Sequence, residues 1–415
     1  MTRIDRERSA RRIEHDIETL AGPAYTSSSE AICRYAYTDV YERTLRYFTD
    51  QLEGLGFRVW RDPVGTLVAS NVEPGAPAFG IGSHCDSNRN GGKYDGTLGV
   101  CTALEVCRLA VEAGGGVPLR LISFLEEEGS GFGQMLLGSR IMAQRVTEEE
   151  LRTSIVDEDG VPFWDSAARA GYPVERWRDS IRTLDGLTGW VEVHIEQGRV
   201  LQDTARRIGV VQAIAGYVHG DLRFAGRADH AGATPMGYRN DASVVAAECV
   251  LELERLAEDA SRRVPTVGTA GEGTVVPNLI NVVPAEVRVG LDIRSVERDS
   301  YRGVVDAITS FAETAAQRRG LRTEYRQRQE TLPTTMDAGV VAALERAVQA
   351  TGQPYRLMPS GASHDTQLVA PHVPSAMLFV PCLDGVSHSP DESASSDDAA
   401  LGAELMLTAI RDLVA

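Results

Sequence analysis

The sequence predicts an α/β protein in which a smaller α+β module interrupts a larger domain. Short apolar runs alternate with helical stretches over residues 57–195, which is typical of a sheet with helices on its faces. About halfway along the chain the pattern changes to the order β-α-β-β-α-β of a ferredoxin-like module. Helical and apolar strand patterns then return. We therefore expect a first part of the larger domain over 1–212, an inserted module over 213–328, and a second part over 329–415.

Periodicity and turn residues define the elements of the first part. Residues 4–56 carry helical periodicity, and residues 98–113 predict a further helix. Residues 146–186 are charged and aromatic without clear alternation, which indicates short helices and loops. The run 119–125 is almost continuously apolar, as expected for a central strand buried on both faces. Strands are expected at 57–59, 67–70, 79–82, 119–125 and 190–195.

Periodicity and turn residues also define the elements of the inserted module and of the last part. In the module, residues 241–259 and 299–319 predict two helices. Its strands are expected at 218–224, 275–283, 285–293 and 323–327. Beyond it, residues 337–351 predict a helix and residues 376–380 an apolar strand.

Composition limits the partners and the compartment. A length of 415 residues favours two domains, and a formal net charge of −17 argues against nucleic acid or an anionic membrane surface as partner. No apolar run reaches the roughly 18 residues that a membrane span needs, and the charged first residues lack an apolar signal core. Six cysteines without a Cys-x-x-Cys pair indicate reduced thiols. We expect a cytoplasmic protein.

Polar side chains gather where the predicted strands end. His84 ends one strand, Glu126-Glu127-Glu128 follow the next, and His194 ends a third. Ligands bind beyond the carboxyl ends of parallel strands, and imidazole and carboxylate are the usual ligands of zinc-like ions. Three adjacent carboxylates repel one another, which favours a positive group at that point. These residues predict a metal hydrolase and leave open whether it holds one ion or two.

Nine motifs occur in order along nearly the whole chain. With these motifs the chain resembles the amidase, hydantoinase and carbamoylase family, a branch of the aminoacylase and carboxypeptidase G superfamily of dinuclear metallohydrolases. The resemblance implies a metallopeptidase-like catalytic domain with a central mixed sheet flanked by helices, interrupted by a ferredoxin-like dimerisation and lid domain. The motifs are residues 82–87, 91–96, 126–130, 194–198, 230–236, 277–284, 292–294, 360–365 and 387–392.

The resemblance implies two divalent metal ions per subunit, for which Mn²⁺, Zn²⁺, Co²⁺ and Ni²⁺ all fit. Asp95 would bridge the two ions. His84 and His194 would complete the shell of one ion, and Glu128 and His388 that of the other. A histidine at position 194, where peptidase relatives carry a carboxylate, is typical of the carbamoylase branch.

The resemblance also implies the catalytic residues. Glu127 would be the general base that takes a proton from water and returns it to the departing nitrogen. Asp86 would orient His84, although a turn-capping role for Asp86 is an alternative. His230 would stabilise the developing oxyanion from the partner subunit of a homodimer.

Substrate recognition would rest on five further residues. The planar fork of Arg294 suits a carboxylate, with a salt bridge inside the module as the alternative. The implied partner is a small molecule with a carboxylate next to a ureido or amide group, enclosed when the module closes over the main domain. The implied substrate-binding residues are Gln197, Asn281, Arg294, Gly361 and His364.

The reaction implied first is hydrolysis of N-carbamoyl-L-amino acids to amino acid, CO2 and ammonia. Allantoate, ureidoglycolate and N-carbamoyl-β-alanine are the alternative substrates. Departures from the family pattern at Asn88-Arg89-Asn90, Gly131 and Arg199 leave the choice open. A non-catalytic relative is disfavoured because the metal ligands and Glu127 are all present. An exopeptidase is disfavoured by His194.

Overall fold

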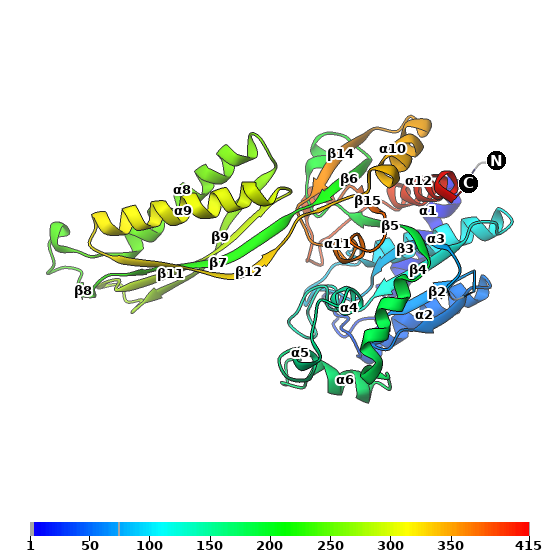
Figure 1. The fold of residues 1–415 in the computed structure, drawn as a ribbon, viewed down its shortest axis with the longest axis horizontal. Helices are drawn as coiled ribbons and strands as arrows, with labels where there is room; N and C mark the ends of the chain where they lie inside the picture. The colour runs from blue at the N-terminus through cyan, green and yellow to red at the C-terminus, as the bar shows by residue number, and fades with distance from the viewer. Residues whose placement is uncertain (1–3, 74, 415) are drawn as a thin grey trace. The chain divides into compact units, whose positions relative to one another are not determined.

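Two units make up the chain in the computed structural model, which describes residues 4–73 and 75–414 (Figure 1). The first unit contains the residues up to Gln212, Met336–Met358 and the residues from His364 onward. The second unit contains Ala213–Thr335 and Pro359–Ser363. The limit expected at residue 328 falls inside the last long strand of the second unit, β12 (Arg322–Thr331).

A mixed sheet forms the centre of the first unit. Its central strands run parallel in the order β4-β3-β5-β15, and the flanking pairs β1-β2, β2-β4 and β15-β6 are antiparallel. Nine strands of the described residues belong to it, in the order β1 (Arg58–Arg61), β2 (Leu67–Ser70), β4 (Leu119–Phe124), β3 (Ala78–His84), β5 (Leu187–Ile195), β15 (Ser375–Val380), β6 (Ile208–Ile214) and β13 (Thr334–Thr335), with β14 (Tyr355–Ser360) also paired to β6. The short β13 and the ends of β6 and β14 are residues of the second unit.

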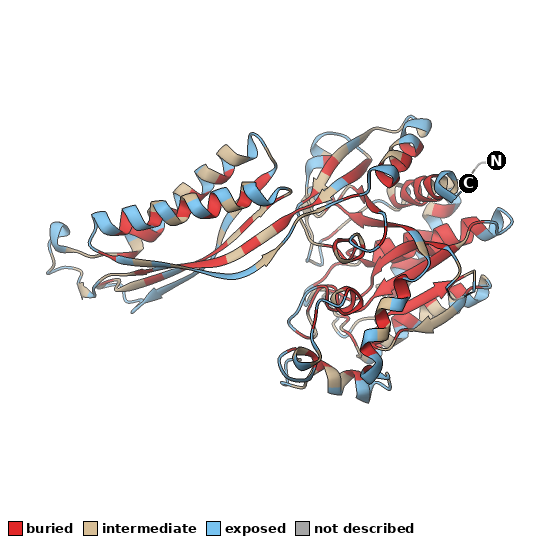
Figure 2. Ribbon diagram, viewed as in Figure 1, coloured by how far each residue is buried: buried red, intermediate tan, exposed pale blue. Residues whose placement is uncertain are grey.

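Helices cover both faces of this sheet (Figure 1). Helix α3 packs on β3 and β5, and it also contacts α1 and α12. On the other face, α4 and α11 enclose a core that includes Phe124, Met142 and Trp190 (Figure 2). The helices of the first unit are α1 (Arg6–Leu20), α2 (Asp39–Gly54), α3 (Thr97–Glu112), α4 (Leu137–Met142), α5 (Glu148–Thr153), α6 (Phe163–Arg169), the 3-10 helix η1 (Val174–Leu184), α7 (Val200–Asp203), α10 (Ala338–Thr351), α11 (Thr366–Val369), the 3-10 helix η3 (Leu383–Gly385) and α12 (Ser396–Val414).

The helical periodicity expected over 4–56 corresponds to two helices. Helix α1 ends at Leu20, and α2 begins after Thr38, whose side chain accepts a hydrogen bond from the backbone N–H of Tyr41. Such a threonine satisfies one of the amide groups left open at a helix start. Helix α2 buries one apolar face that includes Leu45 and Phe48.

The second unit is a four-stranded antiparallel sheet with two helices on one face. The strand order β12-β7-β11-β9 with two crossing helices is that of a ferredoxin-like fold. Every second residue of β7 and β11 points under the helices, which forms a separate apolar core (Figure 2). Its elements are β7 (Gly216–Ala225), β8 (Asp229–His230), the 3-10 helix η2 (Met236–Tyr238), α8 (Ala242–Ser261), β9 (Thr266–Val276), β10 (Val282–Val283), β11 (Glu286–Ser295), α9 (Arg298–Arg318) and β12.

One strand expectation is wrong. The sequence predicts a strand over 275–283, whereas β9 ends at Val276 and only Val282 and Val283 form β10. The residues of β9 include three glycines and several small polar side chains, so their strand signal is weak. Pairing with β11 along nearly its whole length decides the position of β9.

Among the described residues, the helices are too short or too polar to cross a bilayer.

Candidate metal centre

The candidate site lies where the chain leaves three neighbouring parallel strands. His84 is the last residue of β3, Glu126–Glu128 follow β4, and His194 is the penultimate residue of β5. Strand β3 lies between β4 and β5, so the connections after β3 and β4 diverge at this edge of the sheet. This topological switch point is where open α/β sheets bind ligands.

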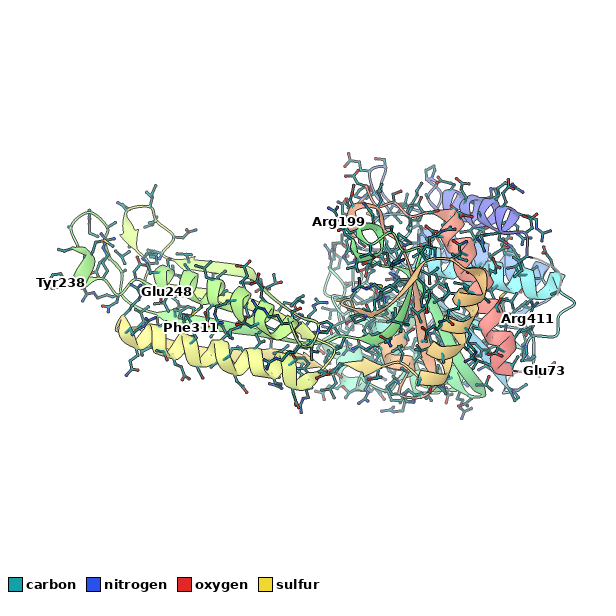
Figure 3. All side chains as sticks on the ribbon, turned by 90° about the horizontal axis from the view of Figure 1, so that it is seen from above. Glu73, Arg199, Tyr238, Glu248, Phe311 and Arg411 are labelled. Atoms are coloured by element: carbon teal, nitrogen blue, oxygen red, sulfur yellow. The ribbon has the colours of Figure 1, made fainter. Side chains whose placement is uncertain are left out.

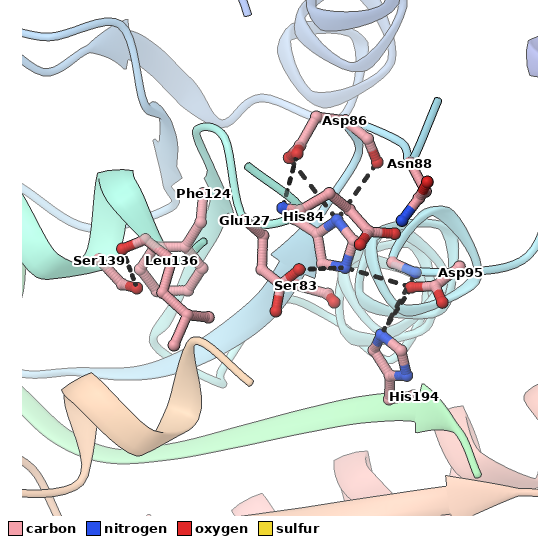
Figure 4. Close-up of polar contacts among 12 residues, drawn as sticks. Ser83, His84, Asp86, Asn88, Asp95, Phe124, Glu127, Leu136, Ser139 and His194 are labelled. Carbon is pink, nitrogen blue, oxygen red and sulfur yellow. Dashed lines mark hydrogen bonds and ion pairs between the residues drawn. The ribbon is translucent and has the colours of Figure 1, made fainter. Parts of the chain in front are cut away.

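Asp95, in the turn before α3, lies at the centre of the site (Figure 4). Its Oδ1 is 3.4 Å from Nε2 of His84 and 3.3 Å from Nε2 of His194. Its Oδ2 is 3.5 Å from Nε2 of His388, which is 3.3 Å from Oε2 of Glu128. The two oxygens of one carboxylate therefore face two separate groups of side chains.

These side chains fit metal ions. Nε2 of His84 and Oε1 of Glu128 are buried and make no hydrogen bond, although buried polar atoms in proteins are nearly always paired. Histidine and carboxylate donors suit zinc, manganese, cobalt and nickel. Among residues 4–73 and 75–414, three groups have ligand atoms close enough to hold an ion: His84 with Asp95 and His194, Asp95 with Glu128 and His388, and Glu192 with His194 and His364.

Charge interactions within the site are strong because its groups are buried. Burial by itself would raise the pKa of Asp95, but His194 and His84 hold that pKa well below its usual range. Burial by itself would lower the pKa of His84, yet the carboxylates of Glu127, Asp86 and Asp95 raise it well above its usual range. The buried histidines and carboxylates thus stabilise each other's charged forms.

Glu127 lies at the edge of the first group. Its Oε2 is 3.7 Å from Nε2 of His84, and burial raises the pKa of Glu127 well above its usual range. A carboxyl group of raised pKa can both accept and return a proton near neutral pH.

Asp86 lies on the other side of His84. Its Oδ1 is 3.6 Å from Nδ1 of His84, its backbone oxygen is 3.3 Å from the same nitrogen, and its Oδ2 accepts a hydrogen bond from the backbone N–H of Glu128. Asp86 therefore links the orientation of His84 to the loop that carries Glu128.

Gly96 lets the chain pass close to His84. Its φ is +59°, and a Cβ atom there would lie 2.3 Å from the His84 ring. The backbone N–H of Gly96 also points at Nε2 of His194, 3.3 Å away. A larger residue at position 96 would displace the His84 ring.

The sequence reasoning missed two buried carboxylates that support the site. Glu192 on β5 accepts hydrogen bonds from the hydroxyls of Ser83 and Thr366. Its position two residues before His194, in an apolar strand, is the signal that could have revealed it. Glu392 accepts hydrogen bonds from the backbone N–H groups of Tyr94 and Asp95, both at 2.8 Å, and so holds the Asp95 turn.

Two of the expected substrate-binding residues belong to the first unit. Gln197, with φ of +57°, donates a hydrogen bond from Nε2 to Oδ2 of Asp95 at 2.7 Å. The ring of His364 lies 4.6 Å from that of His194, measured between centroids, and burial lowers its pKa well below the usual range. His364 is therefore neutral and packed behind a candidate ligand.

Arg294 and Gly361 come together within the second unit. Nε and Nη2 of Arg294 donate to Asp292, and Nη1 donates to the backbone oxygen of Gly361. Nε2 of His219 lies 3.3 Å from the same Asp292 carboxylate. The salt bridge considered as the alternative role of Arg294 is thus present. It occupies the Nε/Nη2 edge of the guanidinium, and Nη1 and Nη2 each retain one N–H beyond the hydrogen bonds to Asp292 and Gly361.

His230 and Asn281 lie at the opposite end of this sheet from Arg294. His230 pairs with Val282, and the backbone N–H of Ala231 donates to the backbone oxygen of Asn281. His230 and Asn281 lie beyond the end of the β7–β11 pair at which Glu286 faces Ala225. Arg294 faces Tyr217 near the other end of this pair. Eight strand residues at about 3.3 Å each separate the two ends by about 26 Å.

The departures from the family pattern occupy different environments. Asn88 places its side-chain nitrogen 3.1 Å from Nδ1 of His388, and Arg89 forms an exposed ion pair with Glu158. The backbone N–H of Gly131 donates to the buried carboxylate of Glu126. Arg199 pairs with Asp203 on the surface of α7.

Residues 81–412 match the family described as peptidase family M20/M25/M40. The chain belongs to this family. An N-carbamoyl-L-amino acid amidohydrolase of Geobacillus stearothermophilus is 36% identical over 382 residues, 91% of this chain and 92% of the relative. A ureidoglycolate hydrolase of Oryza sativa subsp. japonica is 34% identical over 411 residues, 97% of this chain and 84% of the relative. A hydantoinase/carbamoylase family amidase from Burkholderia multivorans has a TM-score of 0.87 at 30% identity, covering 99% of this chain and 98% of that chain.

The family membership confirms the expected fold class and the expected class of enzyme. This M20-family chain is a hydrolase that acts on carbon–nitrogen bonds. The roles assigned to individual residues stay predictions, as do the domain limits, the two ions, the homodimer and the cytoplasmic location.

Proposed function

We propose that this M20-family chain hydrolyses N-carbamoyl-L-amino acids to the amino acid, CO2 and ammonia. The observation that carries the proposal is the arrangement around Asp95, whose two oxygens face His84 and His194 on one side and His388 on the other, with Glu127 beside them. The amidohydrolase relative of Geobacillus stearothermophilus supports the ureido substrate.

Two divalent ions fit the proposal, one held by His84, Asp95 and His194 and the other by Asp95, Glu128 and His388. When bound, such ions polarise a carbonyl group and lower the pKa of water toward neutrality. Asp86 keeps the ring of His84 in place for this task.

Glu127 moves the proton in the proposed reaction. Its raised pKa lets it take a proton from the attacking water. It then gives that proton to the departing nitrogen, which leaves as an amine or ammonia rather than as an anion. Burial of the carboxylate excludes bulk water that would compete for the proton.

Arg294 would bind the substrate carboxylate. Asp292 and the backbone oxygen of Gly361 hold the guanidinium, so its remaining N–H groups on Nη1 and Nη2 are oriented before the substrate arrives. Gln197, Gly361 and His364 would also contact the substrate.

A homodimer would bring His230 and Asn281 to the substrate. Because they lie about 26 Å along the sheet from Arg294, one subunit cannot supply all three residues to one small molecule. Apolar side chains are exposed beside His230, among them Tyr238 (Figure 3), and exposed apolar groups favour burial against a partner. A second copy of this chain is the proposed partner. Besides Tyr238, the exposed apolar side chains beside His230 are those of Met236, Leu279 and Ile280.

Ureidoglycolate is the second candidate substrate. The rice ureidoglycolate hydrolase matches 97% of this chain at an identity close to that of the carbamoyl-amino-acid enzyme. Allantoate and N-carbamoyl-β-alanine share the same combination of ureido group and carboxylate.

Ammonia release from a panel of these compounds tests the proposal. The chain, reconstituted with Mn²⁺, Zn²⁺, Co²⁺ or Ni²⁺, is supplied with N-carbamoyl-L-amino acids, their D-enantiomers, ureidoglycolate, allantoate and N-carbamoyl-β-alanine. The highest kcat/KM is expected for an N-carbamoyl-L-amino acid. A preference for ureidoglycolate would replace the first candidate by the second, and no release from any compound would overturn both.

A further inference from the structure

Asn88 lies beside His388 and contacts the ring nitrogen that faces away from the candidate ions. Its side-chain nitrogen is 3.1 Å from Nδ1 of His388. The opposite ring nitrogen, Nε2, faces Asp95 and Glu128. Asn88 follows β3 in the loop that carries Asp86 (Figure 4), and it belongs to the segment in which the sequence departs from the family pattern.

Each of the three candidate histidine ligands has a partner at its second ring nitrogen. His84 has Asp86 at Nδ1, and His194 has the backbone oxygen of Ile195 at 2.9 Å. His388 has Asn88. Such a partner fixes the tautomer and the orientation of a ligating imidazole.

His388 depends most on its partner. Its side chain is 42% exposed, whereas those of His84 and His194 are 1% exposed. Its backbone has φ of +54°, a conformation that costs energy for a residue other than glycine. Packing therefore restrains this ring less than the other two.

We propose that Asn88 is the positioning residue that sets the tautomer of His388 and so determines the affinity of the second ion. This inference rests on the proposed metal centre. A neutral imidazole that binds an ion through Nε2 carries its proton on Nδ1 and needs an acceptor there. An asparagine amide meets this need by presenting Oδ1.

The same amide also suits the ion-free chain. With the amide nitrogen toward Nδ1, Nδ1 of a neutral ring accepts the hydrogen bond and the ring proton lies on Nε2, which is 3.3 Å from Oε2 of Glu128. Rotating the amide by half a turn exchanges its donor and acceptor ends. Asn88 thus satisfies both tautomers, and an acceptor-only side chain would satisfy only the ion-bound one.

Metal titration of variants tests the inference. Isothermal titration calorimetry with Zn²⁺ and metal analysis after dialysis measure the affinity for each ion. We expect Asn88→Leu to lower the affinity for one of the two ions about 10- to 100-fold. The other ion should keep its affinity. Asn88→Asp keeps the acceptor and is expected to bind both ions at least as tightly as the parent. Asn90→Leu, an exposed change in the same loop, serves as the matched control with parental affinities.

His388→Ala identifies which ion is affected. The double variant Asn88→Leu/His388→Ala should bind ions as His388→Ala does alone, because Asn88 acts through that ring. Two parental affinities in Asn88→Leu, or an equal loss in Asn88→Leu and Asn88→Asp, would overturn the inference. A parent chain that binds fewer than two ions would instead overturn the proposed metal centre.

Nitrogen NMR of histidine-labelled chain reports the tautomer directly. The ring of His388 is expected to carry its proton on Nε2 without metal and on Nδ1 with Zn²⁺. An unchanged tautomer on Zn²⁺ binding would contradict the proposed role, whatever the activity of the loaded enzyme.

Discussion

The Glu127 carboxylate is buried 3.7 Å from His84, outside the three groups of side chains that could hold an ion. A general base must not be coordinated to an ion if it is to accept a proton, and the position of Glu127 meets that condition. Glu127→Gln keeps the shape of the side chain and removes the base. We expect turnover to fall about 10²- to 10⁴-fold, with metal content unchanged by elemental analysis. If Glu127→Gln lost an ion as well as activity, Glu127 would instead be a metal ligand.

Asp62 gives a pH dependence that is independent of the metal centre. Burial raises its pKa from 3.8 to about 6, although Oδ1 accepts hydrogen bonds from the backbone N–H groups of Val64 and Thr66. The folded chain therefore holds this proton more tightly than the unfolded chain. The stability that Asp62 contributes is full below pH 3.8 and is lost as the pH rises to about 6.

Asp62→Asn keeps both hydrogen bonds and removes the charge. The free energy of unfolding of the variant minus that of the parent is expected to rise by about 1–3 kcal/mol from about pH 4.5 to about pH 7.5. Urea unfolding at the two pH values measures the difference. Equal gains or losses at both values would show that Asp62 does not titrate in this range.

At the scale of elements, helix α3 is placed by its close approach to the sheet. Gly99 faces β5, and a Cβ atom there would lie 2.3 Å from the backbone oxygen of Val193. Gly402 of α12 faces the same residue from another direction, but its Cβ would lie 3.4 Å from a methyl group, an ordinary contact. The two glycines therefore form a matched pair.

Gly99→Ala is expected to destabilise the first unit by about 1–3 kcal/mol, because α3 has to shift away from β5. Gly402→Ala is expected to be neutral or slightly stabilising, since alanine favours the helix and has room. Thermal unfolding compares the two. A similar loss in both variants would mean that the spacing of α3 from the sheet is not the limiting contact.

At the scale of the whole molecule, the opposite positions of Arg294 and His230 in the second unit predict complementation between subunits. Coexpression of Glu127→Gln chains with His230→Ala chains would give mixed dimers in which one site has both residues, if His230 acts across the interface. Random assembly in a symmetric dimer then restores about a quarter of parental activity.

The separate variants provide the control for this experiment, because each alone should be nearly inactive. If His230 acts within its own chain, no mixed dimer contains an intact site and the mixture stays inactive. Size-exclusion chromatography with light scattering establishes that dimers form. A monomer would contradict the proposed interface directly.

The sequence predicted much of the fold because many elements carry strong local patterns. The apolar run that became β4 and the periodic stretch that became α9 were found close to their observed limits. Strand β9 was misplaced, because glycines and small polar residues weaken its pattern and its position depends on pairing with β11. Long-range pairing leaves little trace in the residues themselves.

The sequence by itself determined the family, the class of reaction and the candidate residues, because the motifs keep their residue types and order along the chain. Only the tertiary structure decided which atoms meet: Asp95 facing two groups with separate oxygens, Glu392 holding the Asp95 turn, and Asn88 reaching His388. Asn88 and His388 are 300 residues apart. Their contact depends on how β3 and the loop before α12 reach the same edge of one sheet, which spacing along the chain does not encode.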